Sequence, residues 1–90
     1  SSISERKLNF KMELDVRGQR VNEALDNVMH YIDDAIMLNV SSVRIIHGKG
    51  TGALRDEIQR FLRATPGVVS AKDESVQLGG SGVTVVTFDK

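Results

Sequence analysis

The segment LNFKMELDVRGQRVNEALDNVMHYIDDAIMLNVSSVRIIH, residues 8–47, decides the fold because its hydrophobic period changes twice. Apolar and polar residues alternate from Leu8 to Arg17, which predicts a half-buried strand, strongest over Met12–Arg17. Apolar residues then recur every three or four positions, as on one face of a helix: Val21, Ala24, Leu25, Val28, Met29, Ile32, Ala35 and Ile36. Asn39 suits a left-handed helix stop, and VRIIH at 43–47 predicts a second strand. Since a helix separates the two strands, we expect a right-handed βαβ unit with parallel strands.

The second half of the chain predicts one more helix and two more strands. The glycine-rich turn GKGTG at 48–52 leads into a helix that ends at Pro66-Gly67, and its apolar face holds Leu54, Ile58, Phe61 and Leu62. Strands are predicted over 68–72 and 83–88, joined as a hairpin by the polar loop 73–82. Two helices cannot cover both faces of four strands, and the first strand has one polar face. The sequence therefore predicts an α+β two-layer sandwich of order βαβαββ, with a four-stranded mixed sheet and both helices on one face.

The ends of the chain and its composition set the limits of the domain. Residues 1–7 (SSISERK) are polar and aperiodic, as is typical of a linker or of residues left over from an expression tag. We therefore expect one domain over 8–90. The expected core includes the larger apolar side chains Phe10, Met12, Met29, Phe61 and Phe88. The chain lacks cysteine and any apolar run long enough to span a membrane, which favours a cytoplasmic protein without a membrane partner.

The net charge bears on the class of partner. A nucleic-acid binder usually carries an excess of Lys and Arg, because neutralising phosphates supplies most of its non-specific affinity. This chain has 12 Lys and Arg against 12 Asp and Glu. A nucleic-acid site would therefore have to be a local basic cluster, or the rest of a longer protein would have to supply the affinity.

The carboxyl ends of the two parallel strands predict where a ligand binds, since both ends lie at one edge of the sheet. The first strand ends at Asp15 and Arg17, and the second ends at His47. The second helix begins at the same edge, and its unpaired N–H groups suit an anion. We expect a phosphate site there, formed by Arg17, Gly48, Lys49, Gly50, Thr51, Gly52 and Arg55.

Each part of this site also has a purely structural interpretation. The Gly48-Lys49-Gly50 segment fits a tight strand-to-helix turn, and Asp15 beside Arg17 fits a solvated ion pair. A single histidine at a strand end, such as His47, is commonly a structural residue. The functional interpretation depends on their convergence at one edge.

Other motifs fit less well. A P-loop requires Ser or Thr after its lysine, whereas Gly50 follows Lys49. A dinucleotide-binding turn would follow the first strand of a larger sheet, and too little chain remains for one. His30 lies on the long helix, and the carboxylates lack metal-ligand spacing, so no metal site is predicted.

The motifs resemble those of the Smr family. LDVRG at 14–18 resembles L-D-[LV]-[RH]-G, and HGKGTGALR at 47–55 resembles H-G-K-G-x-G-x-L-R. Glu23-Ala24-Leu25 is similar to the start of the family's first helix, and residues 80–86 resemble its closing glycine turn and strand. The resemblance covers roughly residues 12–88. Arg17 in place of histidine and the G-x-G-x-T-x-V ending resemble the branch at the C-terminus of bacterial MutS2 proteins.

The resemblance implies a fold and an activity. The fold is a βαβαββ sandwich similar to the C-terminal domain of a bacterial translation initiation factor. The activity is that of a nicking endonuclease, acting on DNA to suppress recombination or on RNA of stalled or collided ribosomes. The resemblance also implies a larger ATP-binding, mismatch-repair-related chain around this domain, and a site formed by Asp15, Arg17, His47, Gly48, Lys49 and Gly50.

These residues are compatible with three functions. In an endonuclease, Arg17, Lys49 and the helix N–H groups would hold the scissile phosphate, and His47 or Asp15 would transfer protons. No cofactor is expected in the domain itself, although DNA cleavage would draw on activated water, for which a divalent metal is the usual agent. In a non-catalytic module, the same basic residues would dock a larger ATPase onto DNA or rRNA. A protein–protein adaptor would instead use the open face of the sheet.

Overall fold

The strand–helix–strand unit forms as the hydrophobic pattern predicts. In the computed structural model, which describes residues 10–89, β1 (Glu13–Asp15) and β2 (Ser42–Ile46) run parallel. They are connected through α2 (Val21–Met37). Asn39 has a φ of 60°, and this left-handed conformation lets the chain leave α2 toward β2.

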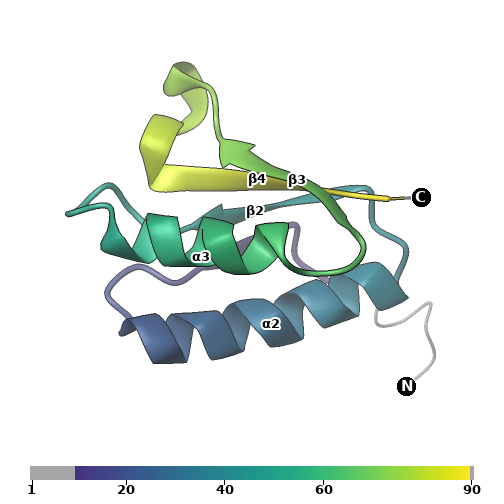
Figure 1. Ribbon diagram of the computed structural model, residues 1–90. Helices are drawn as coiled ribbons and strands as arrows, with labels where there is room; N and C mark the ends of the chain where they lie inside the picture. Colours follow the sequence, from purple (N-terminus) through teal and green to yellow (C-terminus); the bar gives the residue numbers. More distant parts are fainter. Residues whose placement is uncertain (1–9, 90) are drawn as a thin grey trace.

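The second half of the chain supplies α3 (Ala53–Arg63) and the hairpin of β3 (Val68–Asp73) and β4 (Val83–Phe88). Two short 3₁₀ turns, η1 (Val76–Leu78) and η2 (Gly80–Gly82), lie between the hairpin strands. The strand order is β1-β2-β4-β3, with β4 antiparallel to both of its neighbours. Both helices lie on one face of this mixed sheet, so the predicted α+β two-layer fold is confirmed (Figure 1).

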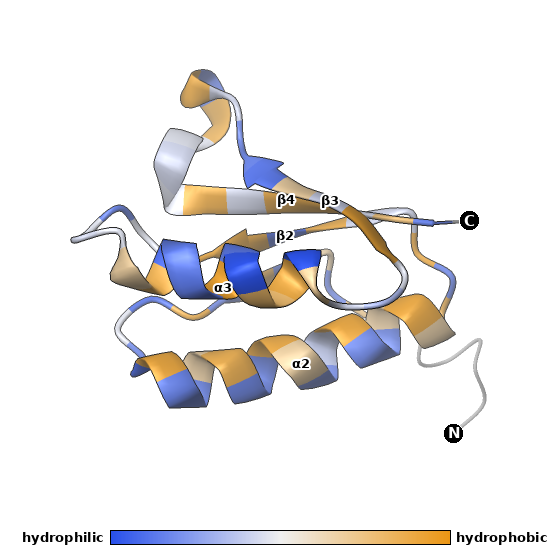
Figure 2. Ribbon diagram, viewed as in Figure 1, coloured by the Kyte–Doolittle hydropathy of each residue, from blue (hydrophilic) through white to orange (hydrophobic). Residues whose placement is uncertain are grey.

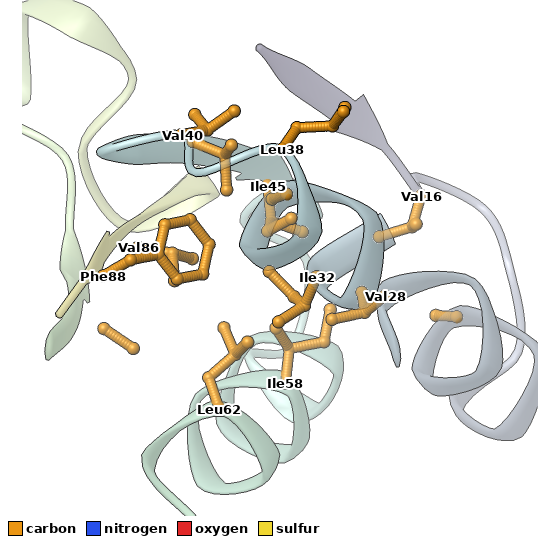
Figure 3. Packing of buried hydrophobic residues seen from close by; sticks show 14 residues of the cluster. Val16, Val28, Ile32, Leu38, Val40, Ile45, Ile58, Leu62, Val86 and Phe88 are labelled. Atoms are coloured by element: carbon orange, nitrogen blue, oxygen red, sulfur yellow. The ribbon is translucent and has the colours of Figure 1, made fainter. Parts of the chain in front are cut away.

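The core fills the space between the helices and the sheet. The hydrophobic side of α2 faces the sheet and its hydrophilic side faces away (Figure 2). Buried side chains from α2, β2, α3 and β4 meet there (Figure 3), among them Val28, Ile32, Val43, Ile45, Ile58, Leu62, Val86 and Phe88. Burying each large apolar side chain contributes about 1.5–3 kcal/mol, so this cluster accounts for most of the driving force for folding.

Two predicted core residues are exposed, and those predictions are wrong. Met12 is 51% exposed because regular pairing of β1 begins only at Glu13, so the predicted alternation does not extend back to Met12. Met29 is 39% exposed because only the centre of the α2 stripe is buried, and Met29 lies on its flank. Phe88 is buried as predicted, whereas Phe10 and Phe61 are partly buried and pack against the core. Leu8, the predicted strand start, lies outside the described residues.

The open face of the sheet is polar at its centre. Arg44 of β2 donates from Nε to Glu74 at 3.0 Å and from Nη2 to the Leu78 carbonyl at 2.7 Å. It also pairs with Glu13 of β1. Arg44 thereby holds the β3–β4 connection against the open face.

The strand directions bring the chemistry-bearing segments to one edge. Because β1, β2 and β3 are mutually parallel, their carboxyl ends and the start of β4 lie at the same edge. Figure 1 shows the three connections that follow these strands at the end of the molecule opposite the C-terminus. We call this end the carboxyl edge, comprising residues 15–18, 47–52 and 73–82.

Candidate active site and nucleic-acid interface

A bidentate ion pair between Asp15 and Arg17 lies at the end of β1. Arg17 Nε donates to the two carboxylate oxygens at 3.0 and 3.1 Å, and Nη2 donates to Oδ2 at 2.7 Å. The Arg17 main-chain N–H donates to Oδ1 at 3.0 Å. These hydrogen bonds hold the pKa of Asp15 below its usual range and raise the pKa of Arg17. Asp15 is therefore an ionised carboxylate at neutral pH.

Arg17 also contacts the loop that follows β2. A Cβ added to Gly48 would lie 3.5 Å from Arg17 Cγ, so the aliphatic part of Arg17 packs against Gly48. Gly48 has a φ of +83°, a conformation that L side chains rarely adopt. The structure therefore brings the two motifs together, and glycine at position 48 permits the contact.

The loop at 48–52 presents several main-chain N–H groups. The Gly82 carbonyl accepts the N–H groups of His47 at 3.1 Å and Gly48 at 2.9 Å. The next three N–H groups, of residues 49–51, have no acceptor among residues 10–89. The loop runs directly into α3, whose N-cap Gly52 has no side-chain cap. Successive free N–H groups at a helix N-terminus favour an anion, so the loop can bind a phosphate.

Lys49 supplies an exposed cation to the same loop. No ion pair of Lys49 occurs within the part of the chain that the structure describes. Its side chain passes over Gly82, where an added Cβ would lie 3.2 Å from Lys49 Cγ. The absence of a side chain at Gly82 therefore leaves room for Lys49.

His47 lies at the same edge but on the other face of the sheet from Asp15. It is 5% exposed, and its Nε2 lies 2.8 Å from Thr84 Oγ1, beneath the sheet on the helix side. Its Nδ1 lies 3.0 Å from the Gly48 carbonyl oxygen. Asp15 instead pairs in register with Ile46, whose side chain is on the opposite face from buried Ile45. The two predicted proton-transfer residues are thus separated by the sheet.

Arg55 is bound to carboxylates. Its Nε and Nη2 donate to the two oxygens of Asp73 at 2.7 and 3.0 Å, and Nη1 donates to Asp56 at 2.8 Å. Hydrogen bonds from Arg55 first, and from Gln59 second, hold the pKa of Asp73 below its usual range. Arg55 therefore joins α3 to β3, and its charge is already neutralised.

Sequence reasoning missed four residues around the site: Gly82, Thr84, Gln59 and Asp73. Thr84 could have been found, since it occupies an inward position in the alternation of β4 together with Val86 and Phe88. A polar side chain at a buried position requires a hydrogen-bond partner, and this signal applies to Gln59 as well.

Residues 10–89 hold neither a cluster of metal ligands nor a helix that could span a membrane. Neither His, Asp nor Glu side chains gather there in a group of three that could hold a metal ion. None of the helices described is long and apolar enough to cross a membrane.

The fold and the edge motifs are those of a known domain family. The Smr domain family matches residues 14–89, and the chain belongs to this family. Its sequence relatives are MutS2 endonucleases. "Endonuclease MutS2" of Halalkalibacterium halodurans is 51% identical over 78 residues, which cover 87% of this chain and 10% of that protein. "Putative endonuclease MutS2" of Bacillus subtilis is 43% identical over 86 residues, which cover 96% and 11%.

Solved structures agree with the sequence relatives. The Smr domain of Thermus thermophilus MutS2 superposes with a TM-score of 0.85 at 44% identity, covering 89% of this chain and 100% of that one. YdaL, a stand-alone small MutS-related protein from Escherichia coli, gives a TM-score of 0.82 at 25% identity, covering 99% and 76%. The chain spans about a tenth of the length of the curated MutS2 relatives, so it corresponds to one domain of those larger proteins.

Proposed function

We propose that this Smr domain binds the phosphate backbone of nucleic acid at the carboxyl edge and cleaves a phosphodiester bond there. One observation carries the proposal. The Asp15–Arg17 pair packs against the same loop that presents Lys49 and three main-chain N–H groups that have no acceptor among residues 10–89. A carboxylate beside an anion-binding loop supplies a general base next to groups that stabilise charge on a phosphate, and phosphodiester cleavage can use both.

Each group has a distinct role in this reaction. Lys49, the loop N–H groups and the unused N–H groups of Arg17 bind phosphate oxygens and stabilise the charge that develops on them. Asp15 accepts the proton of the nucleophile, because it is ionised at neutral pH and its side chain is 47% exposed. Asp15 is a better candidate for this step than His47, because the His47 side chain is only 5% exposed and lies on the helix side of the sheet.

The proposed substrate is DNA or RNA, which the domain contacts through the phosphate backbone. Contacts to phosphate carry no base information, so we expect little sequence preference. RNA brings its own nucleophile, the 2′-hydroxyl, whereas DNA needs activated water, for which a divalent metal is the usual agent. The rest of a MutS2-like, ATP-binding chain in the cytoplasm would supply much of the affinity for DNA or for the ribosome, since this domain has no net charge.

The activity is tested by electrophoresis of supercoiled plasmid and of labelled RNA after incubation with the purified domain. We expect nicked plasmid or shortened RNA at a rate above the buffer control. The variant Lys49→Ala should lose this activity, whereas Arg60→Ala removes the same charge from an exposed site about 10 Å along α3 from its start and should keep it.

One observation favours a second function, non-catalytic docking of a larger ATPase onto DNA or rRNA. Arg17 and Arg55 are neutralised by Asp15 and Asp73, which leaves Lys49 as the principal free cation of the edge among the described residues. Docking predicts binding that weakens with salt, without cleavage of plasmid or RNA by the wild-type domain. Cleavage that depends on Asp15 would rule it out.

A further inference from the structure

A chain of hydrogen bonds runs beneath the sheet from α3 to the phosphate loop. Gln59 Nε2 donates to Asp73 Oδ1 at 2.9 Å and to Thr84 Oγ1 at 3.0 Å. Thr84 Oγ1 lies 2.8 Å from His47 Nε2, and His47 Nδ1 lies 3.0 Å from the Gly48 carbonyl oxygen. Gln59, Thr84 and His47 are 4%, 0% and 5% exposed. Buried polar groups with all partners present hold one geometry, so this chain is rigid.

The partners of His47 determine its tautomer. A carbonyl oxygen can only accept a hydrogen bond, so the proton must be on Nδ1, which donates to Gly48. In the neutral ring, Nε2 then accepts the hydroxyl proton of Thr84. Thr84 is free to donate because the amide of Gln59 donates to its oxygen. The Gly48 carbonyl on one side and the Gln59–Thr84 pair on the other thus together select the Nδ1–H form of His47.

The bond from His47 fixes the orientation of the next peptide. In a trans peptide the C=O and the following N–H point in opposite directions, and no cis peptide occurs among the described residues. Because the Gly48 carbonyl points toward the buried imidazole, the Lys49 N–H points away from it. This N–H has no acceptor within residues 10–89. Rotating the peptide would turn the carbonyl oxygen, rather than the N–H, toward a bound phosphate.

We infer that His47 is a positioning residue that holds the Gly48–Lys49 peptide with its N–H directed at the bound phosphate, and that Thr84 and Gln59 position His47 for this task. The inference rests on the proposed function, since it names what orients the phosphate loop. It assigns no proton transfer to His47. The ring lies on the helix side of the sheet, and both of its nitrogens are engaged within the protein.

The tautomer is measured first, on the free domain, by nitrogen NMR of the imidazole ring. The inference requires a protonated Nδ1 and an unprotonated Nε2 in the wild-type domain. Thr84→Val removes the hydroxyl without changing the size of the side chain, so both tautomers should become populated and the Lys49 amide signal should shift. Thr87→Val is the matched control, because its hydroxyl bonds Ser70 at 2.9 Å on the opposite face. It should leave both signals unchanged.

Substitutions at His47 then separate positioning from proton transfer. His47→Ala should weaken binding of a labelled RNA oligonucleotide by about tenfold or more, since a hydrogen bond to a charged group is lost, and cleavage should fall with it. His47→Asn places an amide N–H near the former Nδ1 and cannot transfer protons. It should restore binding and cleavage to near the wild-type values. Amide spectra of each variant establish that it is folded.

Three outcomes would overturn the inference. One is a protonated Nε2 in the wild-type domain. The second is wild-type binding by His47→Ala combined with slow cleavage that His47→Asn does not restore, which would assign proton transfer to His47. The third is a Thr84→Val domain whose tautomer and Lys49 amide match the wild type. A wild-type domain that neither binds nor cleaves would instead overturn the proposed function. The tautomer and amide measurements would still test whether His47 holds the Gly48–Lys49 peptide in place.

Discussion

The aliphatic part of Arg17 packs on Gly48, with Arg17 Cγ 3.5 Å from the position that a Gly48 Cβ would occupy. This contact joins the two motifs of the site through residues that are 31 positions apart in the sequence, and it depends on the positive φ of +83° at Gly48. Gly48→Ala should therefore lower the free energy of unfolding by about 1–2 kcal/mol, the cost of placing an L residue in the left-handed conformation. Urea denaturation measures this cost, and equal midpoints for the two proteins would show that residue 48 tolerates a side chain.

Lys49 should dominate the electrostatic part of binding. With Lys49 as the principal free cation of the edge, log K should fall against log salt with a slope of about −0.7 to −0.9. Lys49→Ala should weaken binding of all sequences about equally and reduce the magnitude of this slope by about 1. Arg60→Ala is the matched control, since its guanidinium pairs with Glu57 on the exposed side of α3. Equal salt slopes for wild type and Lys49→Ala would place the phosphate elsewhere.

The Arg55–Asp73 pair should make stability depend on pH. Since the pKa of Asp73 is lower in the folded state than the unfolded value of about 3.9, the pair stabilises the fold above that pH. The contribution is lost as pH falls below the unfolded value toward the folded pKa. Asp73→Asn should therefore show a smaller drop in urea midpoint between neutral pH and about pH 3 than the wild type does. An identical drop would mean that the pair contributes nothing to acid stability.

RNA cleavage should depend on the substrate's own nucleophile. An attack by the 2′-hydroxyl on the adjacent phosphate needs only acid–base help, so cleavage of RNA should survive EDTA. It should stop when a single 2′-deoxy nucleotide replaces the one at the cut. An oligonucleotide with the deoxy nucleotide one position away from the cut is the control and should be cleaved normally. Cleavage at the deoxy position, or its loss in EDTA, would indicate activated water instead.

Much of this fold follows from hydrophobic period alone. The change from period two to the helical period and back predicts the βαβ unit, and the topology of that unit then places Asp15, Arg17 and the 48–52 loop at one edge. The sequence also predicts on which face of the sheet His47 lies, because alternation along β2 puts it with Val43 and Ile45 on the buried side. A histidine in register with core residues is a structural signal that the sequence pattern already contains.

Other features depend on tertiary geometry that no local pattern encodes. The Arg55–Asp73 pair joins residues 18 apart and is set by the rotation of α3 against β3. The exposure of Met12 follows from where pairing of the short edge strand begins, which the alternation of its residues does not define. The hydrogen bonds from the His47 and Gly48 N–H groups to the Gly82 carbonyl likewise depend on how the β3–β4 hairpin is placed against the end of β2.

The Asp15 carboxylate is proposed to accept a proton at the carboxyl edge, and the variant Asp15→Asn removes that ability without changing the size of the side chain. The amide oxygen can still accept the two hydrogen bonds that Arg17 N and Nε donate to Oδ1, and loss of the negative charge should leave phosphate binding equal or tighter. We predict that Asp15→Asn lowers the rate of plasmid or RNA cleavage by about 10²–10⁴-fold while the Kd for the same nucleic acid does not rise. Cleavage by Asp15→Asn at the wild-type rate would contradict the assignment of this edge as the active site.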